Sequence, residues 1–259
     1  MKNMKSGNKK RKVLTILACI LLTAGILAIS WPSILNFLYQ RKADAAIGEF
    51  QEAVADYGKD PLQKEVTDPS EKNRAEQVDD SDPYEELYRR MQEYNKNLFE
   101  TGQSGLTDPF AYEQPSFDLT QFGFAENIVG HIDIPKLKVR MPIYLGASHD
   151  NMEKGAAHLS QTSLPIGGEN TNCVIAAHRG SFQAEMFRNI HKLELGDTVS
   201  ITNFRETLTY KVDKIKIIAP SDIDQILIQP GRDLVTLSTC NPLGYNYQRY
   251  IVYCERQVG

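Results

Sequence analysis

Six short segments of alternating apolar and polar residues constrain the fold of this chain most strongly. Period-two alternation is typical of β-strands with one buried face, and clusters of Gly, Pro and Asn separate these segments. A short helical stretch is expected only near residues 184–190. So many strands with so little helix predict a mainly β protein whose sheet forms a closed or nearly closed barrel. The six segments are residues 127–135, 172–178, 197–202, 207–218, 233–240 and 249–256.

The amino-terminal part of the chain carries a membrane signal. Residues 1–12 hold six basic side chains and no acidic one, and residues 13–40 carry no charge at all. The most apolar part, residues 13–31, is long enough to cross about 30 Å of hydrocarbon as a helix. We therefore expect a cytoplasmic tail over residues 1–12 and a single transmembrane anchor over residues 13–31, with the rest on the extracellular face of the cell membrane. A cleaved signal peptide is the alternative, but no clear small-residue cleavage site follows the run.

An acidic segment follows the anchor. Residues 43–93 contain fifteen Asp and Glu against six Lys and Arg, with few aromatic side chains. This composition predicts a solvated, partly helical stalk over residues 32–80 that carries no chemistry of its own.

The next region, residues 81–124, is expected to hold an amphipathic helix. Within "DPYEELYRRMQEYNKNLF", apolar side chains recur at three- and four-residue spacing, which predicts a helix that packs on the following domain. Asp82 is expected at its N-cap and Pro83 at its first position. The apolar positions are Leu87, Met91, Tyr94 and Leu98.

The chain has four cysteines, and they do not form a disulfide framework. Cys19 lies in the apolar run, so only Cys173, Cys240 and Cys254 are expected outside the membrane, and three thiols cannot all pair within one chain. We expect Cys173 and Cys254 to be small buried apolar side chains. In "DLVTLSTC" the alternation places Cys240 on the polar face of its strand, which favours a groove position over a core position.

Two further residues complete a reactive set with Cys240. His178 ends the apolar run "NCVIAAH", directly before Arg179 and Gly180. Arg249 opens the last strand nine residues after Cys240, and an antiparallel return would let the two flank one cleft. A thiol, an imidazole and a permanent cation supply a nucleophile, a proton shuttle and an oxyanion partner, the parts needed for acyl transfer. No Asp or Asn is obviously placed to orient His178, so the papain arrangement is not implied.

The motifs around these residues resemble the sortases, membrane-anchored cysteine transpeptidases of Gram-positive bacteria. The resemblance covers residues 127–256 and includes "GHIDIP", "MPIYLGAS", "GAAHLSQTSLPIGGENTN", "HRGSFQAEMF", "LELGD", "TYKVD" and "TLSTCNPLGYNYQR". Within the family, the nine-residue step from cysteine to arginine and "SLPIGGENT" resemble class C, the branch that polymerises pilins. The resemblance implies a catalytic sortase β-barrel over residues 125–259 and catalytic roles for His178, Cys240 and Arg249.

The implied reaction needs no cofactor. Cys240 would cleave an LPXTG-like sorting motif between its Thr and Gly and form a thioester. A lysine amine of the next pilin subunit would then resolve the thioester, which makes sorting-signal peptides and pilins the implied partners.

Class C sortases typically carry a lid before the barrel, in which an Asp-Pro-aromatic motif plugs the active site. We assign this lid to Asp108, Pro109 and Phe110, which lie in the Gly- and Ser-containing "TGQSGLTDPFAYEQPSF" shortly before the first barrel strand. The other Asp-Pro-aromatic triplet, residues 82–84, is explained by helix capping.

Several alternatives stay open. Many class C sortases have a second hydrophobic segment after the barrel, whereas this sequence ends at Gly259, so a single-anchor sortase that attaches proteins to peptidoglycan is one alternative. A non-enzymatic, membrane-tethered barrel that binds extracellular peptides is another. An L,D-transpeptidase is disfavoured because its short Ser-His-Gly-Cys spacing is absent. The sequence shows no metal-ligand cluster, no phosphate-binding Gly loop and no basic aromatic patch for nucleic acid.

Overall fold

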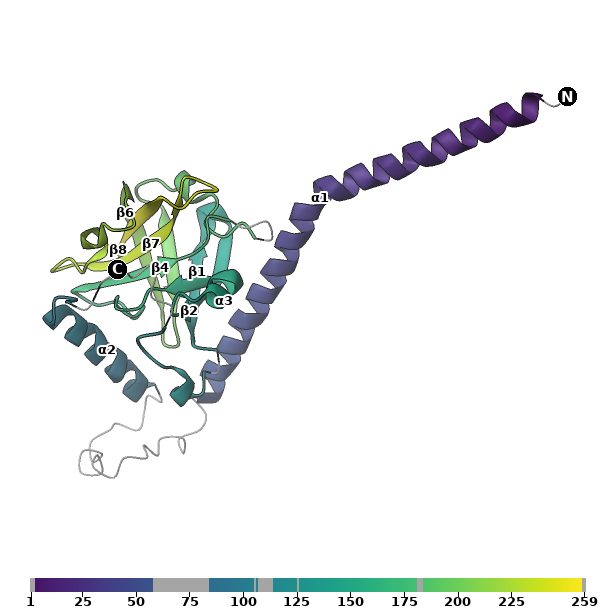
Figure 1. Ribbon diagram of the computed structural model, residues 1–259. Coiled ribbons are helices and arrows are strands. Elements are labelled where there is room, and N and C mark those ends of the chain that lie inside the picture. Colours follow the sequence, from purple (N-terminus) through teal and green to yellow (C-terminus); the bar gives the residue numbers. More distant parts are fainter. Residues whose placement is uncertain are drawn as a thin grey trace.

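The structure, a computed structural model, describes residues 3–57, 84–104, 106, 114–124, 126–180 and 184–257, with side chains from residue 11 onward. A β-barrel forms the body of the molecule, and a long helix projects from it (Figure 1). The helices are α1 (Asn3–Tyr57), α2 (Glu85–Glu100) and α3 (His149–Lys154), with 3₁₀ turns η3 (Thr120–Phe122), η4 (Pro135–Leu137), η5 (Ile190–Lys192) and η6 (Ile223–Ile226). The strands are β1 (Ile128–Ile134), β2 (Val139–Leu145), β3 (Ala156–His158), β4 (Thr171–Ala176), β5 (Thr198–Thr202), β6 (Thr207–Ile218), β7 (Asp233–Asn241) and β8 (Gln248–Arg256).

The sheet is a closed barrel with the strand order β1-β2-β3-β4-β7-β8-β6-β5, which confirms the predicted fold class. All six predicted strands are present. The structure adds β2 and β3, which the sequence pattern did not predict. Pro142 interrupts the strand-like pattern of β2, and β3 has only three residues, so neither gives a clear period-two signal.

Two of the strand pairs are parallel, and one of them matters for the site. β4 runs parallel to β7, while β8 runs antiparallel to β7. The carboxyl ends of β4 and β7 and the beginning of β8 therefore meet at the same rim of the barrel. Pairs of this kind depend on a long crossover connection, so the hydrophobic pattern of the chain does not reveal them.

Both faces of β7 are buried. Val235 and Leu237 belong to the main hydrophobic core inside the barrel. Thr236 and Ser238 point to the other face but are also fully shielded from solvent, because the segment around η6 covers that side. Burial on both faces makes β7 a rigid support for the residue at its end.

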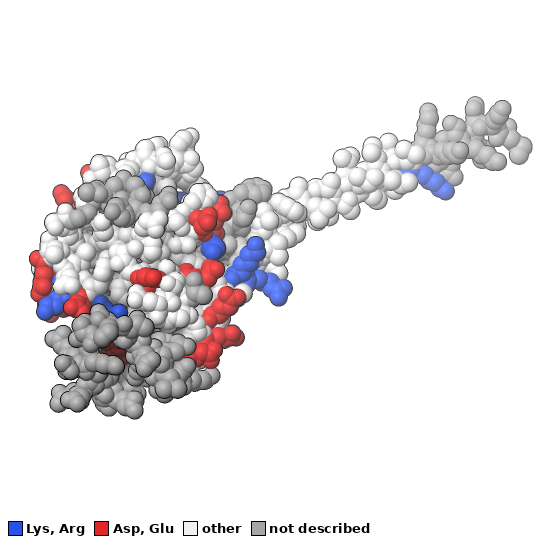
Figure 2. Space-filling view, turned by 60° about the horizontal axis from the view of Figure 1, so that its bottom comes forward, with Lys and Arg blue, Asp and Glu red and all other residues white. Residues whose placement is uncertain are grey.

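Helix α1 continues well beyond the predicted anchor. It contains one stretch that is long and apolar enough to cross a membrane, and Figure 2 shows the projecting part of α1 almost free of charge between basic residues. The helix then packs against β2 and β1. The prediction of a solvated stalk is wrong for this part, because Tyr39, Ala43, Ile47 and Phe50 are buried at helical spacing on one face while the acidic side chains occupy the other.

Helix α2 confirms the predicted amphipathic helix. Leu87 and Met91 are completely buried against the barrel, and Tyr94 and Leu98 are half-buried. The helix begins at Glu85 with Tyr84 at the cap position, whose side chain makes no capping bond, so the predicted N-cap is not at Asp82. Residues 58–83, which include Asp82 and Pro83, lie outside the described residues.

The helical stretch expected near residues 184–190 is wrong. Residues 186–189 form turns, followed by the single 3₁₀ turn η5. The reason is a competing hydrogen bond: the backbone N–H of Phe187 donates to the carbonyl oxygen of His178 at 3.1 Å instead of to a carbonyl within a helix. This bond also fastens the segment to the rim where β4 ends.

Candidate active site

The β7–β8 hairpin places a thiol beside a guanidinium group. Cys240 and Arg249 are direct partners in the antiparallel register, and the loop between the strands turns through residues 242–247. Both side chains are half-buried. Opposed residues of such a pair lie within about 5 Å of each other at the backbone, so the two can face one cleft.

Parallel pairing of β4 and β7 brings His178 to the same level. The register runs from Thr171 opposite Asp233 to Ala176 opposite Ser238. It persists beyond the strand, because the Ala177 N–H donates to Ser238 O at 3.2 Å. Two further residues along this register place His178 level with Cys240.

A second bond holds the same two chains together just below the site. The Thr239 hydroxyl donates to the Ala177 carbonyl oxygen at 2.7 Å, and this hydroxyl is buried. Ala177, which precedes His178, and Thr239, which precedes Cys240, are thus hydrogen-bonded directly to each other. The backbone that carries the imidazole cannot slide relative to the backbone that carries the thiol without breaking this contact.

The environment of His178 favours its neutral form. Partial burial lowers the pKa of His178, nearby His149 lowers it further, and Glu153 opposes this effect. His149 and Glu153 both lie on α3, whose N-terminus is capped by the Ser148 side chain accepting a hydrogen bond from the Asn151 N–H at 3.2 Å. A neutral imidazole can accept a proton from a thiol or an amine.

Arg249 is held against the loop that precedes it. Its Nη1 donates to the carbonyl oxygens of Asn246 at 2.7 Å and of Gln248 at 3.1 Å. A guanidinium group carries five N–H donors in a fixed plane, and such a group can stabilise an oxyanion.

The two other cysteines of the barrel are unsuited to nucleophilic chemistry. Cys173 and Cys254 are buried free thiols, as expected from the sequence, and burial raises the pKa of each well above its ordinary value. Such groups stay protonated and shielded. Cys240 differs from both because it is half-buried at a strand end.

Sequence reasoning assigned no role to Arg179, which the structure places in this cluster. Its Nη1 donates to the Cys240 carbonyl oxygen at 3.3 Å and to Asn241 Oδ1 at 2.6 Å. Its guanidinium carbon lies 5.1 Å from the centre of the Tyr250 ring. The signal in the sequence that could have found Arg179 was its position directly after His178. The sequence does not show, however, in which direction the Arg179 side chain points.

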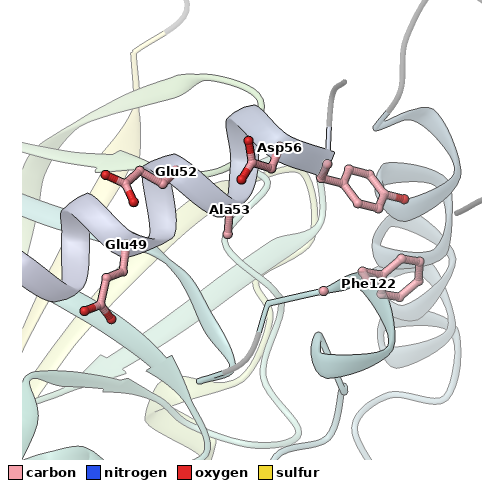
Figure 3. A pocket seen from close by; sticks show the side chains of 7 residues that line it. Glu49, Glu52, Ala53, Asp56 and Phe122 are labelled. Atoms are coloured by element: carbon pink, nitrogen blue, oxygen red, sulfur yellow. The ribbon is translucent and has the colours of Figure 1, made fainter. Parts of the chain in front are cut away.

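One pocket lies apart from this cluster. It has a volume of about 560 Å³, lies between the end of α1 and η3, and includes none of the three predicted catalytic residues. It is lined by Glu49, Glu52 and Asp56 together with Tyr57 and Phe122 (Figure 3). The predicted lid, Asp108–Phe110, falls within residues 107–113, which lie outside the described residues. Among the residues that are described, no group of three His, Cys, Asp or Glu side chains could hold a metal ion.

The fold is thus a closed barrel with a cysteine, a histidine and an arginine at one rim. This arrangement defines a class of proteins whose site is suited to cysteine-based acyl transfer. A family model for the sortase domain matches residues 132–257. Sortase D of Bacillus subtilis is 32% identical over 130 residues, covering 49% of this chain and 63% of that protein, and Sortase A of Bacillus anthracis is 25% identical over 62% of this chain and 76% of that protein.

Solved structures agree with this match. The structure of "Sortase C1 of GBS Pilus Island 1" superposes with a TM-score of 0.64 at 32% identity, covering 84% of this chain and 93% of that one. Sortase C from Clostridium perfringens SM101 superposes with a TM-score of 0.57 at 34% identity, covering 75% of this chain and 98% of that one. The chain belongs to the sortase family, and class C sortases are among its structural neighbours.

Proposed function

We propose that this protein is a cysteine transpeptidase that cleaves an LPXTG-like sorting motif. The observation that carries the proposal is the meeting of Cys240, Arg249 and His178 at one rim through two different strand pairings. In the first step neutral His178 takes the proton of the Cys240 thiol, and the sulfur attacks the carbonyl carbon of the Thr–Gly peptide bond of the motif. Arg249 stabilises the oxyanion, and His178 gives a proton to the leaving amine as the C–N bond breaks, which leaves a thioester.

In the second step an amine takes the place of the departed peptide. His178, now neutral, accepts a proton from the incoming amine, which attacks the thioester carbonyl, and the Cys240 sulfur leaves. We propose a pilin lysine as this amine, because the class C structural neighbours include proteins described as pilus-related. Attachment to a peptidoglycan amine is the alternative that the experiment below separates.

We propose that α1 anchors the enzyme with its amino terminus in the cytoplasm and the barrel outside the cell membrane. The basic residues 1–12 precede the apolar run, and positive charge beside a membrane span favours the cytoplasmic side. The barrel packs directly on the continuation of this helix, so the catalytic rim is held at a fixed place relative to the anchor.

We also propose that Asp108, Pro109 and Phe110 form a lid over the site. The residues on both sides of this triplet are fastened to the connection between β3 and β4: the Gln103 side chain donates to Gln161 O at 3.1 Å, and the Gln161 N–H donates to Ser116 Oγ at 2.7 Å. A segment tied to the barrel at both ends can carry its middle over the barrel. If this proposal is right, substitutions in Asp108 or Phe110 should affect the site, whereas substitutions in the other Asp-Pro-aromatic triplet, residues 82–84, should not.

The decisive experiment uses the full-length protein in detergent with an LPXTG-like peptide, a candidate pilin and a peptidoglycan cross-bridge amine. Mass spectrometry of the products reads which amine is joined to the peptide. We expect a thioester on Cys240 and a product linked to the pilin lysine. Cys240→Ala should form neither, while Cys173→Ala and Cys254→Ala should retain both.

Each alternative gives a different result. A product joined only to the cross-bridge amine would identify a peptidoglycan-anchoring enzyme. A thioester mapped to Cys173 or Cys254 would overturn the assignment of the nucleophile. Peptide binding without any thioester, and equal in Cys240→Ala, would identify a binding module.

A further inference from the structure

Arg179 connects the backbone segment that carries His178, the proposed acid–base residue, to the segment that carries Cys240, the proposed nucleophile. It follows His178 directly in the chain, at the end of β4, and its side chain crosses to the end of β7. Gly180 comes next with a φ of +85°, a left-handed conformation that glycine adopts without strain, so the chain can turn away immediately after Arg179.

The contacts of Arg179 reach the nucleophile residue itself. One nitrogen, Nη1, donates both to the carbonyl oxygen of Cys240 and to Oδ1 of Asn241, the next residue. Asn241 in turn donates through Nδ2 to the Gln248 side chain at 2.9 Å, and Gln248 precedes Arg249. One chain of hydrogen bonds therefore connects the His178 segment to β7 and β7 to the start of β8.

The guanidinium group of Arg179 also lies over the Tyr250 ring. The cation lies 5.1 Å from the ring centre, within the range of a cation–π contact. Arg179 Nε is buried and has no hydrogen-bond partner among the residues that the structure describes. A buried donor without a partner costs free energy. The other contacts of the Arg179 side chain must therefore hold it in this position.

We propose that Arg179 is a positioning residue that sets the separation of His178 and Cys240 by bracing the end of β4 against the end of β7. The inference rests on the proposed transpeptidase function for its kinetic readout but not for its structural one. Arginine suits this role because one guanidinium nitrogen can donate to two acceptors while the planar, weakly hydrated cation lies over a ring, whereas lysine presents a compact, strongly hydrated ammonium group.

Two effects of Arg179 have to be separated, its geometry and its charge. A guanidinium beside Cys240 also attracts a thiolate, wherever its hydrogen bonds are directed. Arg179→Lys keeps the charge and loses the fork. Asn241→Ala keeps Arg179 and its charge but removes the acceptor of its shorter bond. Arg179→Gln removes both the fork and the charge.

The experiment measures kcat and KM for peptide transfer, the pH profile of Cys240 alkylation by iodoacetamide, and amide hydrogen exchange in the full-length protein. For Arg179→Lys we expect kcat to fall by about tenfold to a hundredfold with KM changed by less than about threefold. We expect faster exchange at residues 177–180 and 238–241 with an unchanged pH profile of alkylation. Arg179→Gln should alter that profile as well.

The double variant Arg179→Lys/Asn241→Ala tests whether the two residues act as a unit. If Arg179 and Asn241 act through the same contact, the loss of kcat in the double variant should be close to the loss in the more affected single variant. The matched control is Arg232→Lys, the same substitution at the other end of β7, where the arginine pairs with Glu255 at 2.9 Å and Asp213 at 2.6 Å. It should lower stability without changing kcat or exchange at the catalytic rim.

Three results would overturn the proposal. Wild-type kcat and exchange in Arg179→Lys would show that the fork braces nothing. A lower kcat with unchanged exchange would show that Arg179 acts on the substrate and not on the backbone. Additive losses in the double variant would show independent roles. If the wild-type protein transfers no peptide, the proposed function fails, while hydrogen exchange still decides whether Arg179 braces the rim.

Discussion

Replacing Asn95 by alanine should detach helix α2 from the barrel. Asn95 is 5% exposed, and its side chain hydrogen-bonds to both the N–H and the C=O of Leu164, in the connection between β3 and β4. Its Nδ2 donates to Leu164 O at 3.3 Å, and Leu164 N donates to its Oδ1 at 2.7 Å. The Asn95 amide thus hydrogen-bonds to the Leu164 backbone as a neighbouring strand would, and the Leu164 side chain is itself buried.

The magnitude follows from the group that Asn95→Ala leaves without a partner. The N–H of Leu164 would lose its acceptor, whereas the C=O of Leu164 would keep the Ile166 N–H, which donates to it at 2.8 Å. One buried group left unsatisfied costs about 1–3 kcal/mol, so we expect the free energy of unfolding to fall by about that amount. With a urea m-value of about 2 kcal/mol/M, the unfolding midpoint should fall by about 0.5–1.5 M.

The assay is urea unfolding of the full-length protein in mild detergent, followed by circular dichroism. Asn97→Ala is the matched control, because Asn97 lies on the exposed face of the same helix and its side chain does not contact Leu164. Both substitutions change helix propensity equally, so the difference between the two midpoints isolates the Leu164 bonds. Equal midpoints for the two variants would refute the reasoning, since the Leu164 groups would then be satisfied in another way.

Three further predictions concern the site and the pH dependence of stability. Arg249→Lys should slow acylation on the order of a hundredfold in single-turnover assays because a point ammonium does not reproduce the planar fork, and near-wild-type acylation would contradict this. Asp108→Ala and Phe110→Ala should each speed alkylation of Cys240 by a small reagent roughly five- to thirtyfold, and unchanged rates would exclude the proposed lid. Burial lowers the pKa of His158 to about 4, so as pH falls from about 6.5 to about 4 the unfolded chain binds a proton that the folded chain excludes, and stability should drop by about 3 kcal/mol. His158→Gln should lose less stability between pH 7 and pH 4.5, measured as urea midpoints, and a loss equal to that of the wild type would contradict this prediction.

Local signals were sufficient for much of this molecule. The six alternating segments predicted a closed barrel because strands with one buried face must alternate, whatever their partners are. The buried positions of Cys173 and Cys254 were expected because a free cysteine within a strand behaves as a small apolar side chain. The approach of Cys240 to Arg249 was also within reach, because one short antiparallel hairpin joins them and its loop length sets the register.

Weak local signals explain the missed elements. β3 is three residues long and β2 contains Pro142, so each is stabilised by its neighbours in the closed sheet more than by its own sequence. The acidic composition of residues 43–57 concealed an apolar stripe that becomes meaningful only because β2 and β1 are there to bury it. An average over composition cannot show on which face of a helix the charges lie.

The sequence by itself determined the barrel class, the apolar helix and the choice of candidate reactive side chains, since these depend on residue type and on spacing within one or two elements. Only the tertiary structure decided that His178 stands level with Cys240, because that depends on the parallel pairing of β4 and β7, whose residues are separated by a long stretch of chain. The direction of the Arg179 side chain was decided in the same way. Its partners Cys240, Asn241 and Tyr250 come from strands that only the closed barrel brings beside it.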